Sequence, residues 1–119
     1  MWGKRLSARQ QQGRAGEQAA LTFLQRRGLV LVEANFACKG GEIDLIVRDG
    51  ATLVFVEVRE RADEGHGGAA ASIGPAKIRR IIHAAETYLQ RFDDLPACRI
   101  DVVAIDAGHI EWLQNAIEV

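Results

Sequence analysis

Acidic residues recur at alternate positions in two neighbouring segments of the chain. Glu42 and Asp44 begin a segment that alternates as a β-strand, residues 42–48, and Glu57 lies in an apolar strand segment, residues 53–59. Alternate residues of a strand point to the same face of a sheet. If the two segments pair, their carboxylates are therefore expected to share one face.

The register of this pairing depends on the turn between the segments. Asp49-Gly50 is a strong signal for a two-residue hairpin turn. That turn would place Glu42 directly opposite Glu57 and make Asp44 a diagonal neighbour of Glu57, with Cα atoms about 7 to 8 Å apart. The two carboxylates would then be within reach of one shared ion.

Like charges that face each other destabilise a sheet, so the arrangement requires a reason. A divalent cation is one, because Mg²⁺ takes one or two carboxylates and completes its octahedral shell with water and substrate phosphate. Asp44, Glu57 and a backbone carbonyl would suffice. The alternative is that the carboxylates are solvated at the ends of the sheet or paired with Arg59 and Arg61. Glu57 indicates a bound ion more strongly than Glu42 does, because its apolar neighbours would make an unpaired carboxylate costly to desolvate.

The elements that must position these residues can be predicted from periodicity and from Gly and Pro placement. Leu29–Phe36 is expected to precede the hairpin as a strand, and the glycine-rich stretch 61–74 is expected to be a loop. The other expected elements are a first helix over 13–27, a second helix from Pro75 to about Phe92, and strands over Arg99–Ile105 and Ile110–Leu113.

This order, α-β-β-β-α-β-β, predicts an α/β protein with a mixed sheet flanked by helices. The helix between the third and fourth strands favours a parallel pair with a right-handed crossover. A length of 119 residues fits one domain, expected over residues 13–119 and preceded by a mobile basic segment, residues 1–12.

Composition narrows the classes of protein further. With 48% hydrophobic and 26% charged residues the chain is of the globular type, and its apolar runs are too short to span a membrane. Two cysteines 60 positions apart, expected to be buried thiols, and an N-terminus without an apolar signal region indicate a cytoplasmic protein. The three histidines have no zinc-finger spacing, and His66 has at most a weak claim to approach a substrate.

The net charge of −1 hides a strong segregation along the sequence. Residues 1–40 carry +5, residues 41–76 carry −4, residues 77–91 carry +3 and residues 92–119 carry −5. Basic side chains in the two positive segments, among them Arg14, Lys77 and Arg80, are candidate phosphate contacts, although a solvated helix face is the simpler reading of each.

Four stretches of the chain carry a shared set of motifs. They are Gly13-Arg-Ala-Gly-Glu17, Gly41-Glu-Ile-Asp44-Leu-Ile, Phe55-Val-Glu57-Val-Arg59 and Gly67-Gly-Ala-Ala-Ala-Ser-Ile followed by Lys77. Over about residues 13–112 the chain thereby resembles the bacterial YraN family, which is similar to the PD-(D/E)XK nuclease superfamily and particularly to archaeal-type Holliday junction resolvases.

The resemblance implies a restriction-endonuclease-like fold and a role for each matching residue. Asp44 and Glu57 would be the metal-binding acids, Glu17 an additional carboxylate at the metal, and Lys77 a helix residue near the scissile phosphate. Arg59 stands where the superfamily motif has lysine. Arginine stays protonated, so it could supply charge and hydrogen-bond donors but could not remove a proton.

Three functions remain open at this point. The first is a Mg²⁺- or Mn²⁺-dependent endonuclease acting on DNA, with branched or junction DNA as one class of substrate. The second is a nucleic-acid-binding protein that keeps the nuclease fold without cleavage, and the third is an acidic protein-interaction domain. DNA is expected more than RNA, no membrane partner is expected, and analogy with junction-cutting relatives suggests a homodimer.

Overall fold

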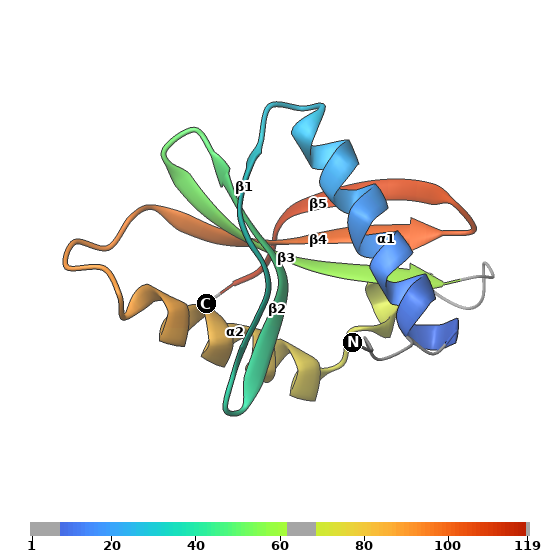
Figure 1. Ribbon diagram of the computed structural model, residues 1–119. Helices are drawn as coiled ribbons and strands as arrows, with labels where there is room; N and C mark the ends of the chain where they lie inside the picture. Colours follow the sequence, from blue (N-terminus) through green and yellow to red (C-terminus); the bar gives the residue numbers. More distant parts are fainter. Residues whose placement is uncertain (1–7, 62–68, 119) are drawn as a thin grey trace, which may run out of the picture.

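The protein is a mixed β-sheet with one α-helix on each face (Figure 1). The computed structural model describes residues 8–61 and 69–118. The elements are α1 (Ala8–Gln25), β1 (Val30–Cys38), β2 (Gly41–Asp49), β3 (Thr52–Arg61), the 3-10 turn η1 (Ala70–Ser72), α2 (Pro75–Leu89), β4 (Cys98–Asp106) and β5 (His109–Ile117).

The five strands lie in the sheet in their order along the chain, β1-β2-β3-β4-β5. β3 and β4 are parallel, and every other neighbouring pair is antiparallel. The chain between the two parallel strands carries α2, because parallel neighbours cannot be joined by a tight turn. The predicted α/β class, the element order and the parallel pair are confirmed.

Each helix covers one face of the sheet and closes one half of the core. Ala20 and Leu24 of α1 pack against Leu45, Val54 and Val103. On the opposite face α2 packs a second cluster, which includes Ile81, Ala84, Tyr88, Ile43, Phe55 and Ile100. Central strands buried on both faces carry near-continuous apolar runs, as β3 does from Leu53 to Val56. A charged residue in such a strand is therefore conspicuous.

Several boundaries differ from those expected. α1 begins at Ala8, five residues before the predicted start at Gly13, so part of the segment expected to be mobile is helical. Residues 1–7 and His66 lie outside the described residues. Cys98 is exposed and Cys38 is partly exposed, so the expectation of two buried thiols is wrong.

The hairpin turn between β2 and β3 is displaced by one residue from the predicted position. Asp49 pairs with Thr52, so the turn consists of Gly50 and Ala51, and Gly50 takes the left-handed conformation with φ 62°. Asp49 stays in the strand, where its carboxylate accepts a hydrogen bond from Arg99 at 3.0 Å. The predicted register, with Glu42 opposite Glu57, is therefore wrong, although the same residues of β2 still share a face.

Among the described residues, no helix is long and apolar enough to cross a membrane.

Candidate functional site

β2 and β3 separate at the positions of Asp44 and Glu57. Their backbone pairing ends at Leu45 and Val56, after which β2 continues beside β1 alone and β3 continues beside β4 alone. The N–H of Val58 donates a 2.8 Å hydrogen bond to Asp44 Oδ2, so a side chain takes the place of the missing backbone partner. In the observed register the next pair would be Asp44 and Glu57, which places both carboxylates at the point of separation.

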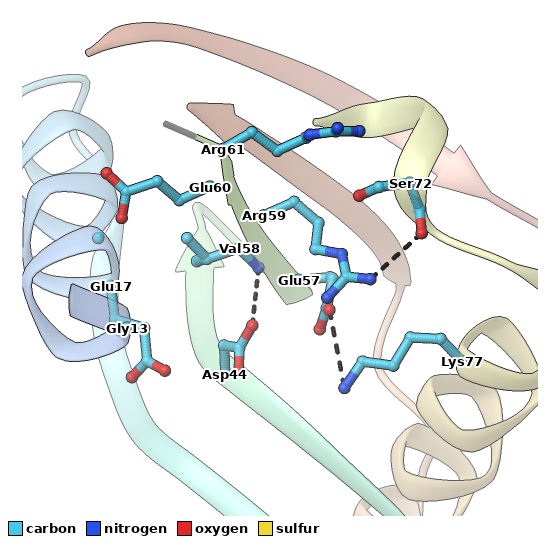
Figure 2. A pocket seen from close by; sticks show the side chains of 11 residues that line it. Gly13, Glu17, Asp44, Glu57, Val58, Arg59, Glu60, Arg61, Ser72 and Lys77 are labelled. Atoms are coloured by element: carbon cyan, nitrogen blue, oxygen red, sulfur yellow. Dashed lines mark hydrogen bonds and ion pairs between the residues drawn. The ribbon is translucent and has the colours of Figure 1, made fainter. Parts of the chain in front are cut away.

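A pocket of about 470 Å³ opens where the strands part. Figure 2 shows that its side chains come from α1 on one side and α2 on the other, with β2 and β3 between them. Among the described residues that line it are four carboxylates and three basic side chains: Glu17, Asp44, Glu57, Glu60, Arg59, Arg61 and Lys77. Three of the four acids are those that the sequence singled out.

Glu57 is the most perturbed group of the pocket. Its side chain is only 2% exposed, and Oε1 is buried without a hydrogen-bond partner among the described residues. Burial, followed by the negative charge of Asp44, raises the pKa of Glu57 to about 8, although the charges of Lys77 and Arg59 oppose the shift. An ionised, unpaired carboxylate is costly at such a position, so the pocket favours either a proton or a cation on Glu57.

Lys77 reaches the pocket from the first turn of α2. Its Nζ lies 3.3 Å from Glu42 Oε1 and 3.7 Å from Glu57 Oε2. The helix can approach this closely because residue 41 is glycine: a Cβ there would clash with the carbonyl oxygen of Arg80 on α2. Gly41 therefore contributes to the site by letting α2 lie against the start of β2.

Arg59 is held by the 3-10 turn after the loop. Its Nη2 donates a 3.2 Å hydrogen bond to the carbonyl oxygen of Ser72, while its buried Nε has no hydrogen-bond partner among the described residues. The guanidinium thus lies inside the pocket with donor capacity to spare (Figure 2).

Glu17 projects from α1 into the same pocket. The pKa of Glu17 is raised from its ordinary value, because burial and the charge of Asp44 outweigh two effects that lower it. These are a hydrogen bond from the Asn35 side chain and the charge of Arg14. Asn35 itself has a positive φ of 56°. Such a conformation outside glycine is uncommon and is often found at functional sites.

Asn35, like Glu60 of the pocket lining, is a residue of this neighbourhood that sequence reasoning missed. It sits in β1, between the pairs Ala34 with Leu45 and Phe36 with Ile43, and so lies opposite Asp44. The one available signal was its type, because Asn enters the left-handed region more readily than other non-glycine residues. A lone Asn in a strand segment is too weak a pattern to single out.

The predicted phosphate contacts do not all meet at this pocket. Lys77 lines it, and Arg14 lines an adjoining hollow together with Glu17 and Asn35. Arg80 lies apart, in a shallow depression beside Gly40 and His83. Of the three, Lys77 is the one placed to act on a group bound at Asp44 and Glu57.

The donor set of the pocket fits a hard divalent cation. Asp44 and Glu57 would hold it, and the buried Oε1 of Glu57 supplies an oxygen that no described residue uses. Within residues 8–61 and 69–118 no three acidic, His or Cys side chains converge into a complete cage. Two carboxylates still match Mg²⁺, which keeps several waters and is commonly bound through one or two carboxylates together with substrate phosphate.

Fold and site together define a class: a small α/β protein with a carboxylate pair where two antiparallel strands of its mixed sheet diverge. The family model described as "Uncharacterised protein family UPF0102" matches residues 16–105. The chain therefore belongs to the UPF0102, or YraN, family, as its motifs indicated.

Individual relatives cover almost the whole chain. A UPF0102 protein of Herminiimonas arsenicoxydans is 62% identical over 112 residues, which span 94% of this chain and 90% of the relative. A UPF0102 protein of Janthinobacterium sp. (strain Marseille) is 58% identical, covering 94% and 91%, and one of Cupriavidus metallidurans is 57% identical, covering 95% and 85%. The similarity thus includes all elements that form the pocket.

Proposed function

We propose that the protein is a Mg²⁺- or Mn²⁺-dependent endonuclease that hydrolyses phosphodiester bonds in DNA. The observation that carries the proposal is the pairing of Asp44 with a buried Glu57 whose Oε1 lacks a partner among the described residues, at the point where β2 and β3 separate. The resemblance to the PD-(D/E)XK superfamily, with its metal-binding acids at the matching motif positions, supports the same function.

The charge balance of the pocket explains why a cation would be needed for a phosphate to enter. When Glu57 is ionised, the described lining carries four carboxylates against three basic groups, so an approaching phosphodiester meets a surplus of negative charge. Asp44 and Glu57 would hold the cation, and Glu17 would add a third carboxylate at the edge of the site. When bound there, a divalent cation would reverse that balance, and the chemistry it would supply is polarisation of a phosphoryl oxygen and a lower pKa for a bound water.

Two basic side chains would act on the phosphate itself. Arg59, fixed by Ser72, presents a permanent positive charge and free donor capacity toward developing charge on the phosphoryl oxygens. Lys77 supplies a second, mobile charge from α2. Since Arg59 cannot accept a proton, proton removal from the attacking water rests on the acidity of the water and on the carboxylates.

Arg59 also favours a second candidate function, a nucleic-acid-binding protein that retains the nuclease fold without cleavage. The guanidinium of Arg59 occupies the position of the motif lysine and bonds a backbone carbonyl, so that position supplies no general base. Such a protein would bind DNA with strong salt dependence through phosphate contacts and would leave it intact.

Incubation of the purified protein with Mg²⁺ or Mn²⁺ and with duplex, nicked, single-stranded and branched DNA tests the first proposal. We expect cleavage that EDTA stops and that Asp44→Ala reduces at least 100-fold, because the variant loses a cation ligand. Glu86→Ala, which removes an exposed carboxylate on the solvent side of α2, is the matched control and should cleave like the wild type. Absence of cleavage on all four substrates with either cation rejects the enzymatic function.

A binding titration separates the two candidates. Fluorescence anisotropy with the same DNA substrates at 50 and 200 mM salt should show affinity that falls steeply with salt in either case. Binding without cleavage supports the non-catalytic protein. Neither binding nor cleavage rejects both.

A further inference from the structure

Lys77 is shared between two carboxylates of different character. Glu57 is buried at the bottom of the pocket, whereas the Glu42 side chain is 53% exposed at its rim. The Nζ of Lys77 lies within 4 Å of both, slightly closer to Glu42. The ammonium thus stands beside Oε2 of the same carboxylate whose Oε1 a cation would use, and it also has a second anchor at Glu42.

We propose that Lys77 competes with the divalent cation for the Glu57 carboxyl group: its ammonium lies beside Glu57 when no cation is present and moves toward Glu42 when one binds. The inference rests on the proposed cation site at Asp44 and Glu57. It assigns Glu42, a residue without a role in the scheme above, as the positioning residue that makes this movement possible.

The physical basis is repulsion between like charges. A lysine ammonium within 4 Å of Glu57 is repelled by a divalent ion on the same carboxylate, because two units of positive charge face a third at short range. Moving Nζ toward Glu42 lowers that repulsion without leaving the lysine unpaired. The flexible four-carbon stem of lysine allows this movement, whereas the planar arginine group would be harder to relocate.

Lys77 is expected to weaken cation binding whether or not Glu57 is protonated beforehand. A divalent cation carries more charge than the proton that it displaces, so Lys77 opposes the exchange of proton for cation as well as direct binding. Removing the charge of Lys77 should therefore tighten cation binding, about 10-fold for a repulsion of about 1.4 kcal/mol. Removing the charge of Glu42 should weaken binding several-fold, because Lys77 then has only Glu57 as a partner.

Titration of the metal-free protein with Mn²⁺, followed by calorimetry, tests the inference in a double-mutant cycle. We expect Lys77→Met to bind about 10-fold tighter than the wild type and Glu42→Gln to bind about 3-fold weaker or worse. The double variant should bind like Lys77→Met, since Glu42 acts through the lysine. Arg79→Met, an exposed charge two positions along α2, should leave the affinity unchanged.

The charge-retaining variant Lys77→Arg is the control for an effect of side-chain shape at residue 77. It should bind Mn²⁺ no more tightly than the wild type. Equal or weaker binding by Lys77→Met, or a Glu42→Gln effect that persists in the double variant, overturns the inference while leaving the cation site in place. Absence of Mn²⁺ binding by the wild type and by every variant instead overturns the proposed function and this inference with it.

Discussion

The Glu57 carboxyl group makes the stability of the apo protein depend on pH. Its pKa is raised from about 4.5 to about 8, so between these values the folded state holds a proton that the unfolded state has released. The unfolded state binds fewer protons over this range. The free energy of unfolding should therefore fall as pH rises from about 5 to about 8 in the absence of divalent cations.

Replacing Glu57 by Gln should remove this dependence. The variant keeps the size of the side chain and cannot ionise, so we expect it to be more stable than the wild type at pH 8 by on the order of 2–4 kcal/mol, and nearly equal at pH 5. Urea denaturation in EDTA at both pH values measures the difference. Glu86→Gln is the exposed control, and a wild-type profile that is flat over this range would contradict the raised pKa.

Asn35 combines a backbone role with a polar one, and two substitutions separate them. Asn35→Gly tolerates the positive φ but removes the hydrogen bond to Glu17, whereas Asn35→Ala loses the hydrogen bond and is strained by the backbone conformation as well. We expect the alanine variant to be less stable than the glycine variant by about 1 kcal/mol.

The pKa of Glu17 should rise in both Asn35 variants, because the hydrogen bond that lowers it is gone. Carboxyl NMR titration measures that shift. An unchanged Glu17 pKa in both variants would show that Asn35 only shapes the strand.

Among the elements, the β4–β5 hairpin depends on one buried charge. Asp101 is fully buried, accepts hydrogen bonds from Arg99, from the indole N–H of Trp112 and from the backbone N–H of Asn115, and lies at an irregularity in the pairing of the two strands. Its carboxylate therefore fixes the register where the backbone ladder is interrupted.

Asp101→Ala should cost about 3–5 kcal/mol, because it leaves the Nε of Arg99 and the two N–H donors of Trp112 and Asn115 without their partner in a buried place. Chemical denaturation at pH 7 measures the loss. Glu111→Ala, which removes an exposed carboxylate from the same hairpin, should change stability by less than about 0.5 kcal/mol. A similar small change in the Asp101 variant would show that the network does not stabilise the fold.

These elements also show how much of the structure could be predicted from the sequence. Periodicity and turn residues sufficed to predict α1, α2 and the strands β1 to β4, and to place Asp44 and Glu57 on one face of the sheet, although the register between them was wrong. β5 was predicted to end at Leu113; it continues to Ile117, and the Asn115 N–H in this added part donates to the Asp101 carboxylate. The turn between β2 and β3 was misplaced for a similar reason, because a hydrogen bond from Arg99, 50 residues away, holds Asp49 in the strand. Such long-range contacts leave no pattern in the local sequence.

At the scale of the whole molecule, a cation bound at the pocket should stabilise the fold through mass action. A ligand that binds only the folded state at 100 times its dissociation constant adds about 2.7 kcal/mol. For a chain of 119 residues that corresponds to a rise in Tm of roughly 10 °C. Differential scanning fluorimetry with Mn²⁺ against EDTA measures it, and Asp44→Ala should abolish the shift. A shift that survives in Asp44→Ala would place the cation elsewhere on the molecule.

The separation of β2 from β3 also interrupts the backbone hydrogen bonding across the sheet, so we expect two units that open independently. Beyond Leu45 and Val56 the β1–β2 hairpin is joined to β3 by the side chain of Asp44, which accepts from the Val58 N–H, and its tip is attached to α2 through the 2.9 Å contact between His83 Nε2 and the Lys39 carbonyl. Native-state hydrogen exchange should therefore report lower protection for Phe36–Ile43 than for Leu53–Val56. Asp44 and Glu57 belong to units that can open separately, so an ion that binds both would join them and slow exchange in the hairpin.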